Sequence, residues 1–580
     1  PVLVEERATQ PIQGQKTGTS GLRKKVAEFQ KPNYLANWVQ CLFDTLQPSG
    51  LKGSELVVGG DGRYFNDVAI QVIIKIAAAN GIKKIIVGQN GIISTPAVSA
   101  IIRARKLFGG IILTASHNPA GPTEDFGIKY NGSNGGPALE SVTNQIYDKS
   151  LVIQRFLTAS NVPDVDLSVV GEASGVKEAT EGEFEVEVID SIDEYQRLLE
   201  AVFDFGLIRT FLQKNPPLRL AIDSMHGVTG VYARRIFGKT LLGLSDETLA
   251  DPASSPLRHS ACLPDFGGLH PDPNLTYAAD LVTEMYSGSR DFGVAFDGDG
   301  DRNMILGNSF FVTPSDSLAV IASFAKEAIP VFHSGLQAVA RSMPTSGAVD
   351  RVAKALAIPF FEVPTGWKFF GNIMDHYEAL QTPNVICGEE SFGTGSDHIR
   401  EKDGIWAALA WLSILAFKNK DVVDGSLVTI EKIITDHWKQ YGRNYYSRHD
   451  YENVEEAAAA NVMAELQSLQ ASLLSSGDLQ LDGRKLAVVD EFQYNDQFDQ
   501  SVTSKQGTRF IFEDGSRIIF RLSGTGSSGA TIRVYIERFE PNPENHNLET
   551  QAALADLIQI ANHISKIEKH TGRSHPNVIT

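Results

Sequence analysis

Three aspartates stand at alternate positions of the run "AFDGDGDRNMILG", between two apolar stretches that are typical of strands. They are Asp297, Asp299 and Asp301, and the glycines between them allow the backbone to turn tightly. Carboxylates that converge in one turn repel each other unless a cation lies among them. The pattern therefore predicts a cation site, and an acidic turn without a metal is the alternative.

The residues that follow the aspartates indicate which cation to expect. An EF-hand calcium loop requires glycine at its sixth position and glutamate at its twelfth, where this chain has Arg302 and Asn308. Three oxygen ligands leave coordination positions open for phosphate or water, as magnesium sites usually do. We therefore expect Mg²⁺ rather than Ca²⁺.

A serine and a histidine stand together in "IILTASHNPAGPT", residues 111–123, just past another apolar run. Ser116 and His117 are neighbours, whereas the histidine of a Ser-His relay usually comes from elsewhere in the chain. No Gly-x-Ser-x-Gly turn surrounds this serine either. These features argue against a hydrolase. They leave an ordinary turn before proline or a serine whose role depends on the other loops.

A glycine-rich run, "RLSGTGSSGATIRVYIE", contains the spacing Gly-x-Gly-x-x-Gly. A dinucleotide site would need a helix next, but "ATIRVYIE" alternates apolar and polar residues like a strand. Backbone N–H groups and hydroxyls in such a loop can cradle an anion, and the flanking Arg521 and Arg533 can grip a phosphate. The run predicts an anion site, with a flexible hairpin loop as the alternative.

A fourth polar loop, "GEESFGTGSDHIREKDG", presents Glu389, Glu390 and Ser391 after a glycine. Carboxylates accept hydrogen bonds from sugar hydroxyls, and a serine hydroxyl can donate or accept them. The loop is suited to the recognition of a polyol. On composition alone, a solvated polar loop explains it equally well.

The elements that must position these loops alternate between strand and helix patterns. Residues 55–63 and 109–118 indicate strands, and residues 67–81 and 95–106 indicate helices. Such alternation predicts βαβ units and a largely parallel sheet, which binds ligands at the carboxyl ends of its strands. Ser116 lies just past one such end.

The same alternation returns twice further along the chain. It returns in residues 218–307 and in residues 331–398, so three α/β blocks are expected. A helical stretch at 454–474 then precedes strand-like runs between residues 484 and 539, which predicts a smaller α+β domain. The acidic segment 165–192 is expected to be a loop or hairpin near a domain boundary.

Composition limits the class of protein. The chain has 580 residues, a net charge of −18 and three cysteines that lie far apart. The charge disfavours nucleic acid and anionic lipid as partners, and the cysteines suggest neither a disulfide framework nor a zinc site. The longest apolar run, residues 405–417, is too short to span a bilayer and predicts a buried helix. No secretion signal begins the sequence, so we expect a cytoplasmic protein without a membrane span.

Four segments together, in this order, resemble the signature loops of the α-D-phosphohexomutase superfamily: "TASHNPAGP", "DGDGDR", "GEESFG" and "RLSGTGSSG". The sequence is similar to the eukaryotic phosphoglucomutase group over nearly its whole length, including "KTGTSGLRKKV", "DFGGLHPDPNLTYAADLV" and "PTGWKFFGN". That group includes parafusin-like proteins, which are linked to regulated secretion.

The resemblance implies four domains around a central cleft, three of them similar mixed α/β domains and the last a C-terminal α+β domain. Each domain would bring one signature loop to the cleft. The expected domains are residues 1–200 with the phosphoserine loop, 201–322 with the magnesium loop, 323–422 with the sugar-recognition loop and 423–580 with the phosphate-binding loop.

The resemblance also implies a role for each matching residue. Ser116 would be the phosphorylated serine. The magnesium ligands would be Ser116, Asp297, Asp299 and Asp301. The cleft residues that assist catalysis would be Ser116 itself, Arg23, His117, Lys129 and Lys402. The substrate would be bound by Arg302, Thr365, Gly366, Glu389, Ser391, Arg521, Ser523, Thr525 and Arg533.

The implied reaction is the reversible conversion of α-D-glucose 1-phosphate and glucose 6-phosphate, through a phosphoserine enzyme and glucose 1,6-bisphosphate as intermediate and activator. Mg²⁺ is the expected cofactor and hexose phosphates are the expected partners of a monomer or weak dimer. Two alternatives stay open. One is a related mutase for mannose or N-acetylglucosamine phosphate. The other is a parafusin-like scaffold or vesicle-associated protein with weak or no mutase activity.

Overall fold

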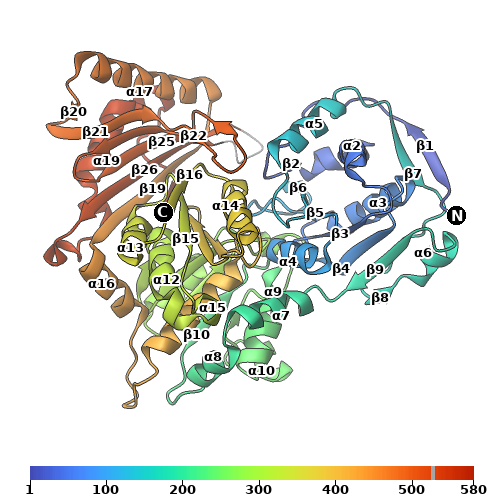
Figure 1. The fold of residues 1–580 in the computed structure, drawn as a ribbon, viewed down its shortest axis with the longest axis horizontal. Helices are drawn as coiled ribbons and strands as arrows, with labels where there is room; N and C mark the ends of the chain where they lie inside the picture. The colour runs from blue at the N-terminus through green and yellow to red at the C-terminus, as the bar shows by residue number, and fades with distance from the viewer. Residues whose placement is uncertain (524–528) are drawn as a thin grey trace.

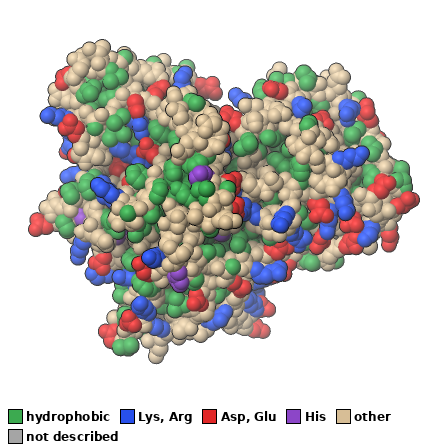
Figure 2. All heavy atoms as spheres, viewed as in Figure 1, with side chains coloured by type: hydrophobic (Ala, Val, Ile, Leu, Met, Phe, Trp, Pro, Cys, Tyr) green, Lys and Arg blue, Asp and Glu red, His purple; other side chains and the backbone are tan. Residues whose placement is uncertain are grey.

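The computed structural model describes residues 1–523 and 529–580. The chain forms four lobes, which Figure 1 shows in sequence order from the blue N-terminal lobe through green and yellow to the red C-terminal lobe. We call these lobes domains I to IV. In the space-filling view the surface is notched between domain IV and domain I (Figure 2), and acidic and basic side chains are interspersed over this face.

Domain I is built on a seven-stranded sheet in the order β2-β6-β5-β3-β4-β9-β8. The four strands β5, β3, β4 and β9 run parallel, and antiparallel strands lie at both edges. The strands are β2 (Leu22–Lys25), β3 (Glu55–Gly60), β4 (Lys84–Ile92), β5 (Gly109–Leu113), β6 (Asp125–Asn131), β8 (Gly171–Glu172) and β9 (Glu185–Ile189). The main helices are α2 (Tyr34–Leu46), α3 (Asn66–Ala79), α4 (Thr95–Arg105), α5 (Glu140–Ser150) and α6 (Ser174–Ala179).

The domain I sheet is covered by helices on both faces, as parallel sheets require. Leu56 and Val58 of β3 pack into the core formed with α2 and α3, whereas Val57 between them packs into the core formed with α4. This alternation follows from the two-residue period of a strand. A separate ribbon, β1 (Val4–Ala8) paired with β7 (Arg155–Ala159), lies beside α3.

Domains II and III repeat the plan with smaller sheets, in the orders β11-β10-β12-β13-β14 and β16-β15-β17-β18. The main elements of domain II are α7 (Asp193–Val202), α8 (Phe205–Leu212), β10 (Leu220–Asp223), α9 (Thr229–Ala233), β11 (Leu257–Arg258), α11 (Ala279–Tyr286), β12 (Phe292–Phe296), β13 (Asn303–Gly307) and β14 (Phe310–Val312). Those of domain III are α12 (Pro314–Ala328), β15 (Ala338–Ser342), α13 (Ala348–Leu356), β16 (Phe360–Val363), α14 (Trp367–Ala379), β17 (Val385–Glu389), β18 (Gly393–Ser396) and α15 (Gly404–Lys418).

Domain IV differs because its seven-stranded sheet, β20-β21-β24-β25-β26-β19-β27, is wholly antiparallel. Helix α16 (Ile430–Tyr441) leads into it, and α17 and α19 pack on the sheet. Its elements are β19 (Arg443–Val454), α17 (Glu456–Ser476), β20 (Gln480–Leu481), β21 (Arg484–Glu491), β24 (Thr508–Phe512), β25 (Arg517–Ser523), β26 (Ala530–Glu540), α19 (Ala555–Ser565) and β27 (Val578–Ile579). The predicted architecture of three mixed α/β domains and a C-terminal α+β domain is confirmed.

One sequence-based prediction needs correction. The segment 165–192 is more than a loop or hairpin, because it contains α6 and because β9 joins the main sheet of domain I in parallel with β4. Val186 and Val188 are buried in that sheet, while the intervening glutamate is partly exposed. The acidic side chains concealed a strand whose alternate residues are apolar.

Two further observations concern the length of the helices and the domain limits. Residues 405–417 lie in the buried helix α15, as predicted. Within the described ranges, no helix combines the length and the hydropathy that a bilayer crossing requires. The exact domain limits stay predictions, and those placed after residues 200 and 322 fall inside α7 and α12.

Candidate active site

The serine loop begins where strand β5 ends, and Ser116 adopts a left-handed conformation with a φ of 54°, which is strained for serine. Its backbone N–H donates to Thr114 Oγ1 at 2.8 Å, and Thr114 Oγ1 donates to Asp61 Oδ2 at 2.6 Å. Arg63 pairs with Asp61 at 3.0 Å, fully buried, and donates to the carbonyl of Ser116 at 3.4 Å. A buried ion pair beyond β3 therefore holds the serine in place.

The aspartate loop joins β12 to β13 and contacts the serine loop. Ser116 Oγ donates to Asp297 Oδ2 at 3.0 Å, and Thr95 Oγ1 donates to Asp299 Oδ2 at 2.6 Å. One carboxylate oxygen from each of the three buried aspartates lies within 4.8 Å of the others. Among the described residues, the Oδ1 atoms of Asp299 and Asp301 have no hydrogen-bond partner. Buried acceptors without donors are rare, so this set fits a divalent cation.

The electrostatics of the aspartate loop also favour a bound positive charge. Burial raises the pKa of Asp297 well above its usual value, and the neighbouring carboxylates add to this effect. Burial and then the charge of Asp299 raise the pKa of Asp301 to about 7. Burial also raises the pKa of Asp299, but Lys129 and Lys402 contribute to a net lowering of that pKa. An all-oxygen donor set with open positions suits Mg²⁺.

His117 and Arg302 border the serine. The Nδ1 atom of His117 lies 3.3 Å from Ser116 Oγ, so the two neighbours contact each other. The serine hydroxyl donates to an aspartate rather than depending on this imidazole, which is unlike a hydrolase triad. Burial lowers the pKa of His117 well below its usual value, and the charges of Arg302 and Arg23 add to this. Arg302 also pairs with Asp272 at 3.5 Å.

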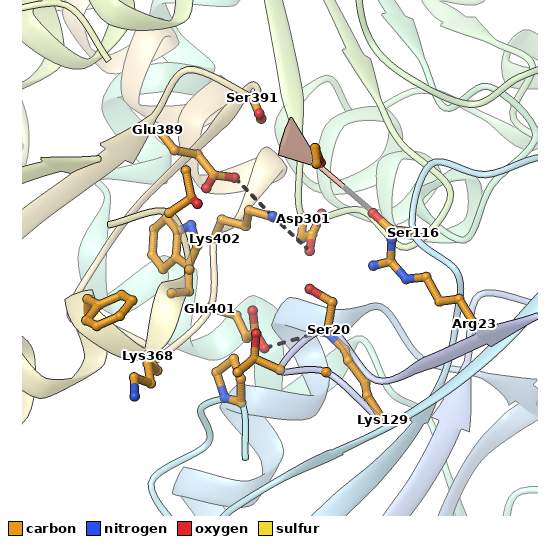
Figure 3. A pocket seen from close by; sticks show the side chains of 18 of the residues that line it. Ser20, Arg23, Ser116, Lys129, Asp301, Lys368, Glu389, Ser391, Glu401 and Lys402 are labelled. Carbon is orange, nitrogen blue, oxygen red and sulfur yellow. Dashed lines mark hydrogen bonds and ion pairs between the residues drawn. The ribbon is translucent and has the colours of Figure 1, made fainter. Parts of the chain in front are cut away.

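The predicted sugar loop follows β17 and is connected to the aspartate loop by a lysine. Lys402 Nζ lies 3.0 Å from Glu389 Oε1 and 3.9 Å from Asp301 Oδ2 (Figure 3). Burial opposes the charge of Lys402, but Asp301 and Glu389 raise its pKa above the usual value. Lys129 pairs with Glu401 at 3.6 Å in the same cavity. The site therefore keeps cations and carboxylates in alternation.

Two arginines of domain IV stand opposite each other on neighbouring strands, Arg521 on β25 and Arg533 on β26. Arg521 Nη2 donates to Thr365 Oγ1 at 2.6 Å, which links domain IV to the loop after β16. Like charges opposite each other repel, and a phosphate between them would relieve that repulsion. Ser523 lines the cavity beside them. Thr525, the remaining predicted phosphate ligand, lies outside the described residues.

One cavity of about 470 Å³ collects loops from all four domains, and this volume suits a small-molecule ligand. Asp297 does not line the cavity, but it contacts Ser116, which does line it. The predicted site residues that line the cavity are Arg23, Ser116, His117, Lys129, Asp299, Asp301, Arg302, Thr365, Gly366, Glu389, Ser391, Lys402, Arg521, Ser523 and Arg533.

Several residues that hold the site were missed from the sequence. Asp61 and Arg63 follow β3, and Thr95 begins α4, so they look like turn and cap residues when considered alone. The position of Asp61 and Arg63 at a strand end is the signal that could have found them, because the same rule identified Ser116. Glu401 gives no comparable signal, since its partner Lys129 is remote in sequence.

The close contact between the two loops gives a first prediction. A Cβ added at Gly298 would lie 2.5 Å from the carbonyl oxygen of Ser116, closer than real Cβ atoms come to other atoms. We expect Gly298→Ala to cost about 1 to 3 kcal/mol through overpacking, measured as a lower midpoint of thermal unfolding. Gly371→Ala is the control, since nothing lies within 4 Å of its added Cβ. Equal midpoints for the two variants would contradict the proposed contact.

Four family models match consecutive parts of the chain. Three are described as phosphoglucomutase/phosphomannomutase alpha/beta/alpha domains I, II and III, and they match residues 14–154, 193–309 and 313–441. The fourth, described as the phosphoglucomutase-1 C-terminal domain, matches residues 443–577.

Relatives of known name are similar over almost the whole chain. The chain is 56% identical to the chloroplastic phosphoglucomutase 1 of Marchantia polymorpha, with 99% of this chain and 84% of the relative covered. It is 54% identical to the cytoplasmic phosphoglucomutase 2 of Zea mays, with 100% and 99% covered. Among solved structures, the open form of the exocytosis-sensitive phosphoprotein pp63/parafusin (phosphoglucomutase) from Paramecium matches with a TM-score of 0.86 and 49% identity, covering 100% and 99%.

Proposed function

The chain belongs to the phosphoglucomutase/phosphomannomutase family, and we propose that it catalyses the reversible conversion of α-D-glucose 1-phosphate and glucose 6-phosphate. One observation carries the proposal: a single cavity is bordered by groups from all four domains. These groups are Ser116, the aspartate loop, the predicted sugar loop and the paired arginines. The names of relatives that are 54% and 56% identical over nearly the whole chain support the same reaction.

In the proposed reaction, phosphorylated Ser116 donates its phosphoryl group to a sugar hydroxyl. The bond between Ser116 Oγ and phosphorus breaks, a bond from the sugar oxygen to phosphorus forms, and glucose 1,6-bisphosphate results. Charge spreads over the phosphoryl oxygens in the transition state, so positioning and cationic groups dominate catalysis. Arg302 and Arg23 are the guanidinium groups we assign to that charge.

Asp297, Asp299 and Asp301 would hold Mg²⁺ together with an oxygen on Ser116, and the ion would supply positive charge beside the phosphoryl group. The proton of the attacking hydroxyl goes to a base in the cavity, for which we propose His117 or Lys129. The serine oxygen regains a proton when it leaves phosphorus.

The second phosphate of the bisphosphate needs its own site. We assign that site to Arg521 and Arg533 with Ser523 and Thr525, and the sugar hydroxyls to Thr365, Gly366, Glu389 and Ser391. The bisphosphate reorients within the cavity, so that its other phosphoryl group can be transferred to Ser116. Separate anion and sugar sites make this reorientation possible, because either end of the ligand fits the same arginines.

The function is tested by a coupled assay of glucose 6-phosphate formation from glucose 1-phosphate, with Mg²⁺ and a trace of glucose 1,6-bisphosphate. Turnover that depends on both additions is the expected result. Mannose and N-acetylglucosamine phosphates as substrates, with their own isomerised products detected directly, test the related mutases. Faster turnover with either of them would contradict the assignment to glucose.

A second role arises from the likeness to the Paramecium protein, which is named an exocytosis-sensitive phosphoprotein. We propose association with secretory vesicles as the alternative function, with the glucose phosphate site as a regulatory one. Absence of turnover in the assay above, together with co-sedimentation of the chain with vesicles, would favour this alternative. A soluble enzyme of the cytoplasm is our main proposal, although relatives with cytoplasmic and chloroplastic names are similarly close.

The phosphate site gives a second prediction. Arg533→Met should lower kcat/KM for glucose 1-phosphate about 10- to 100-fold, mainly through KM, because a charge-assisted hydrogen bond to phosphate is lost. Arg538→Met on the same strand is the control, since Arg538 donates to the carbonyl of Ala553. An unchanged KM in Arg533→Met would argue against the assigned phosphate site.

A further inference from the structure

Strands β25, β26 and β19 are neighbours in the sheet of domain IV (Figure 1). Their register places a row of charged residues opposite one another. Arg521 is opposite Arg533, and Arg533 is opposite Asp450. Arg448 lies two residues before Asp450 on β19, so it faces the same side of the sheet. Two arginines of this row are assigned to the substrate phosphate, whereas Arg448 and Asp450 have no role in the reaction described above.

Asp450 is shared between two guanidinium groups. Its Oδ2 lies 2.9 Å from Arg448 Nη2, and its Oδ1 lies 4.0 Å from Arg533 Nε. All three residues are at most 9% exposed. Burial alone would lower the pKa of Arg448, but the charge of Asp450 raises it above the usual value. Asp450 therefore forms a close ion pair with Arg448 and only a distant one with Arg533, the arginine assigned to the substrate phosphate.

Arg448 also reaches out of domain IV to the predicted sugar loop in domain III. Its Nη1 donates to Ser391 Oγ at 3.0 Å, and Ser391 Oγ donates to Glu390 Oε1 at 3.2 Å. Glu390 accepts a further hydrogen bond from Ser342 at 2.7 Å. Because a guanidinium can only donate, Arg448 occupies a lone pair of the serine oxygen. The hydroxyl proton of Ser391 goes to Glu390, so the remaining lone pair of the serine oxygen is left to accept a hydrogen bond.

These contacts form a continuous chain from the phosphate site to the sugar site. It runs from Arg533 through Asp450 and Arg448 to Ser391, and each link is a contact between charged or hydrogen-bonded atoms. A purely structural ion pair would be expected to satisfy its own atoms, yet Arg448 Nε, Arg533 Nε and Asp450 Oδ1 are buried without a hydrogen-bond partner among the described residues. Such unsatisfied groups are rare in a finished structural network and leave capacity for a ligand.

We propose that Arg448 and Asp450 are positioning residues that couple phosphate binding at Arg533 to the orientation of the Ser391 hydroxyl. A phosphate on Arg533 replaces its loose contact with Asp450, which leaves Asp450 to Arg448 alone. Arg448 is then held more firmly against Ser391, whose remaining lone pair accepts a hydrogen bond from a sugar hydroxyl. The sugar is recognised best when the phosphate is already held. This inference rests on the proposed mutase function and extends it.

The test is a double-mutant cycle between Arg448 and Ser391. Arg448→Met should lower kcat/KM for glucose 1-phosphate about 10- to 100-fold, as expected for a lost charge-assisted hydrogen bond, and Arg448→Lys should recover part of the loss. In a Ser391→Ala background the same Arg448→Met change should cost less than about twofold, because the serine through which it acts is gone. If the two losses simply multiply, the coupling does not exist.

A second comparison addresses the carboxylate. Asp450→Asn should lower kcat/KM for glucose 1-phosphate, and this loss should also shrink in the Ser391→Ala background. Asp490→Asn is the matched control, since Asp490 forms a two-pronged pair with Arg509 in the same domain, at 2.8 Å for each contact, and is not in the cavity lining. It should leave kcat/KM unchanged. A loss after Asp450→Asn that persists undiminished in Ser391→Ala would overturn the role of Asp450.

Binding measurements separate this inference from the proposed function. Calorimetric Kd values for glucose 6-phosphate can complete the same cycle without turnover, and thermal unfolding identifies any variant that fails to fold. Should Arg448→Met fail to fold, Arg448→Lys takes its place in the cycle. An inactive wild-type chain would refute the mutase function, while changes in Kd that simply multiply in the double variant would refute the coupling.

Discussion

Replacement of Ser116 by alanine is expected to abolish the interconversion of glucose phosphates, with kcat lowered by at least about 10⁴-fold. The magnitude is that of losing a covalent nucleophile, for which single substitutions cost about 10⁴- to 10⁶-fold. Without Oγ there is no atom to carry the phosphoryl group between the two positions of the sugar. The coupled assay with glucose 1-phosphate measures the loss directly.

The interpretation requires that the variant still folds and binds its ligand. The Asp61–Arg63 pair holds the backbone of the serine loop, not the Oγ atom, so Ser116→Ala should keep its thermal stability and a Kd for glucose 6-phosphate within a few-fold of wild type. Ser133→Ala, an exposed serine of the same domain, is the activity control. Equal rates for wild type and Ser116→Ala would disprove the phosphoserine mechanism.

Label transfer adds an independent readout. Incubation with glucose 1,6-bisphosphate that carries labelled phosphate should label the wild-type chain at Ser116 and leave Ser116→Ala unlabelled. Label on any other residue in the variant would mean that the phosphoryl carrier has been assigned wrongly.

The parts of the site that could be predicted from sequence are those in which one short segment holds all the chemistry. Asp297, Asp299 and Asp301 are two residues apart, and the glycines between them explain why they converge. The same holds for the serine loop, because the end of a parallel strand is a general location for ligands. The flanking strands could be predicted equally well, since apolar runs of that length form buried strands.

Residue types and spacing alone do not reveal contacts between distant residues. Ser116 and Asp297 are 181 residues apart, and only the family resemblance implied that they share a site; their side chains lie 3.0 Å from each other. No periodicity links Lys129 to Glu401 or Arg448 to Ser391, because these pairs form only when separate domains pack together. The strand at 185–189 was missed for another reason: its alternate glutamates made a sheet strand resemble a solvated segment.

The cavity also shows how a protein with a net charge of −18 can bind a dianionic or more highly charged ligand. Cationic side chains from all four domains line it, and several of them are paired with carboxylates at 3 to 4 Å. When no ligand is bound, pairing with carboxylates offsets the desolvation cost of these buried cations. A phosphate can then replace carboxylate contacts, so that little new charge has to be buried on binding.

Removal of the divalent cation is expected to stop the reaction as completely as loss of the serine. A chelator should abolish turnover, and added Mg²⁺ should restore it. Asp299→Asn should lower kcat by about 10³-fold or more, because loss of metal-derived charge stabilisation is worth several kcal/mol and each 1.4 kcal/mol is tenfold. Asp291→Asn is the control, since Asp291 pairs with Arg219 away from the cavity.

A readout that does not depend on activity makes this prediction sharper. Mg²⁺ at about 100 times its Kd should stabilise the wild-type fold by about 2.7 kcal/mol, seen as a rise in the midpoint of thermal unfolding. Asp291→Asn should show the same rise, whereas Asp299→Asn should show none at that concentration, because the buried carboxylates then offer one charged ligand fewer. A full Mg²⁺-dependent rise in Asp299→Asn would mean that the cation binds elsewhere, and the aspartate loop would lose its assigned role.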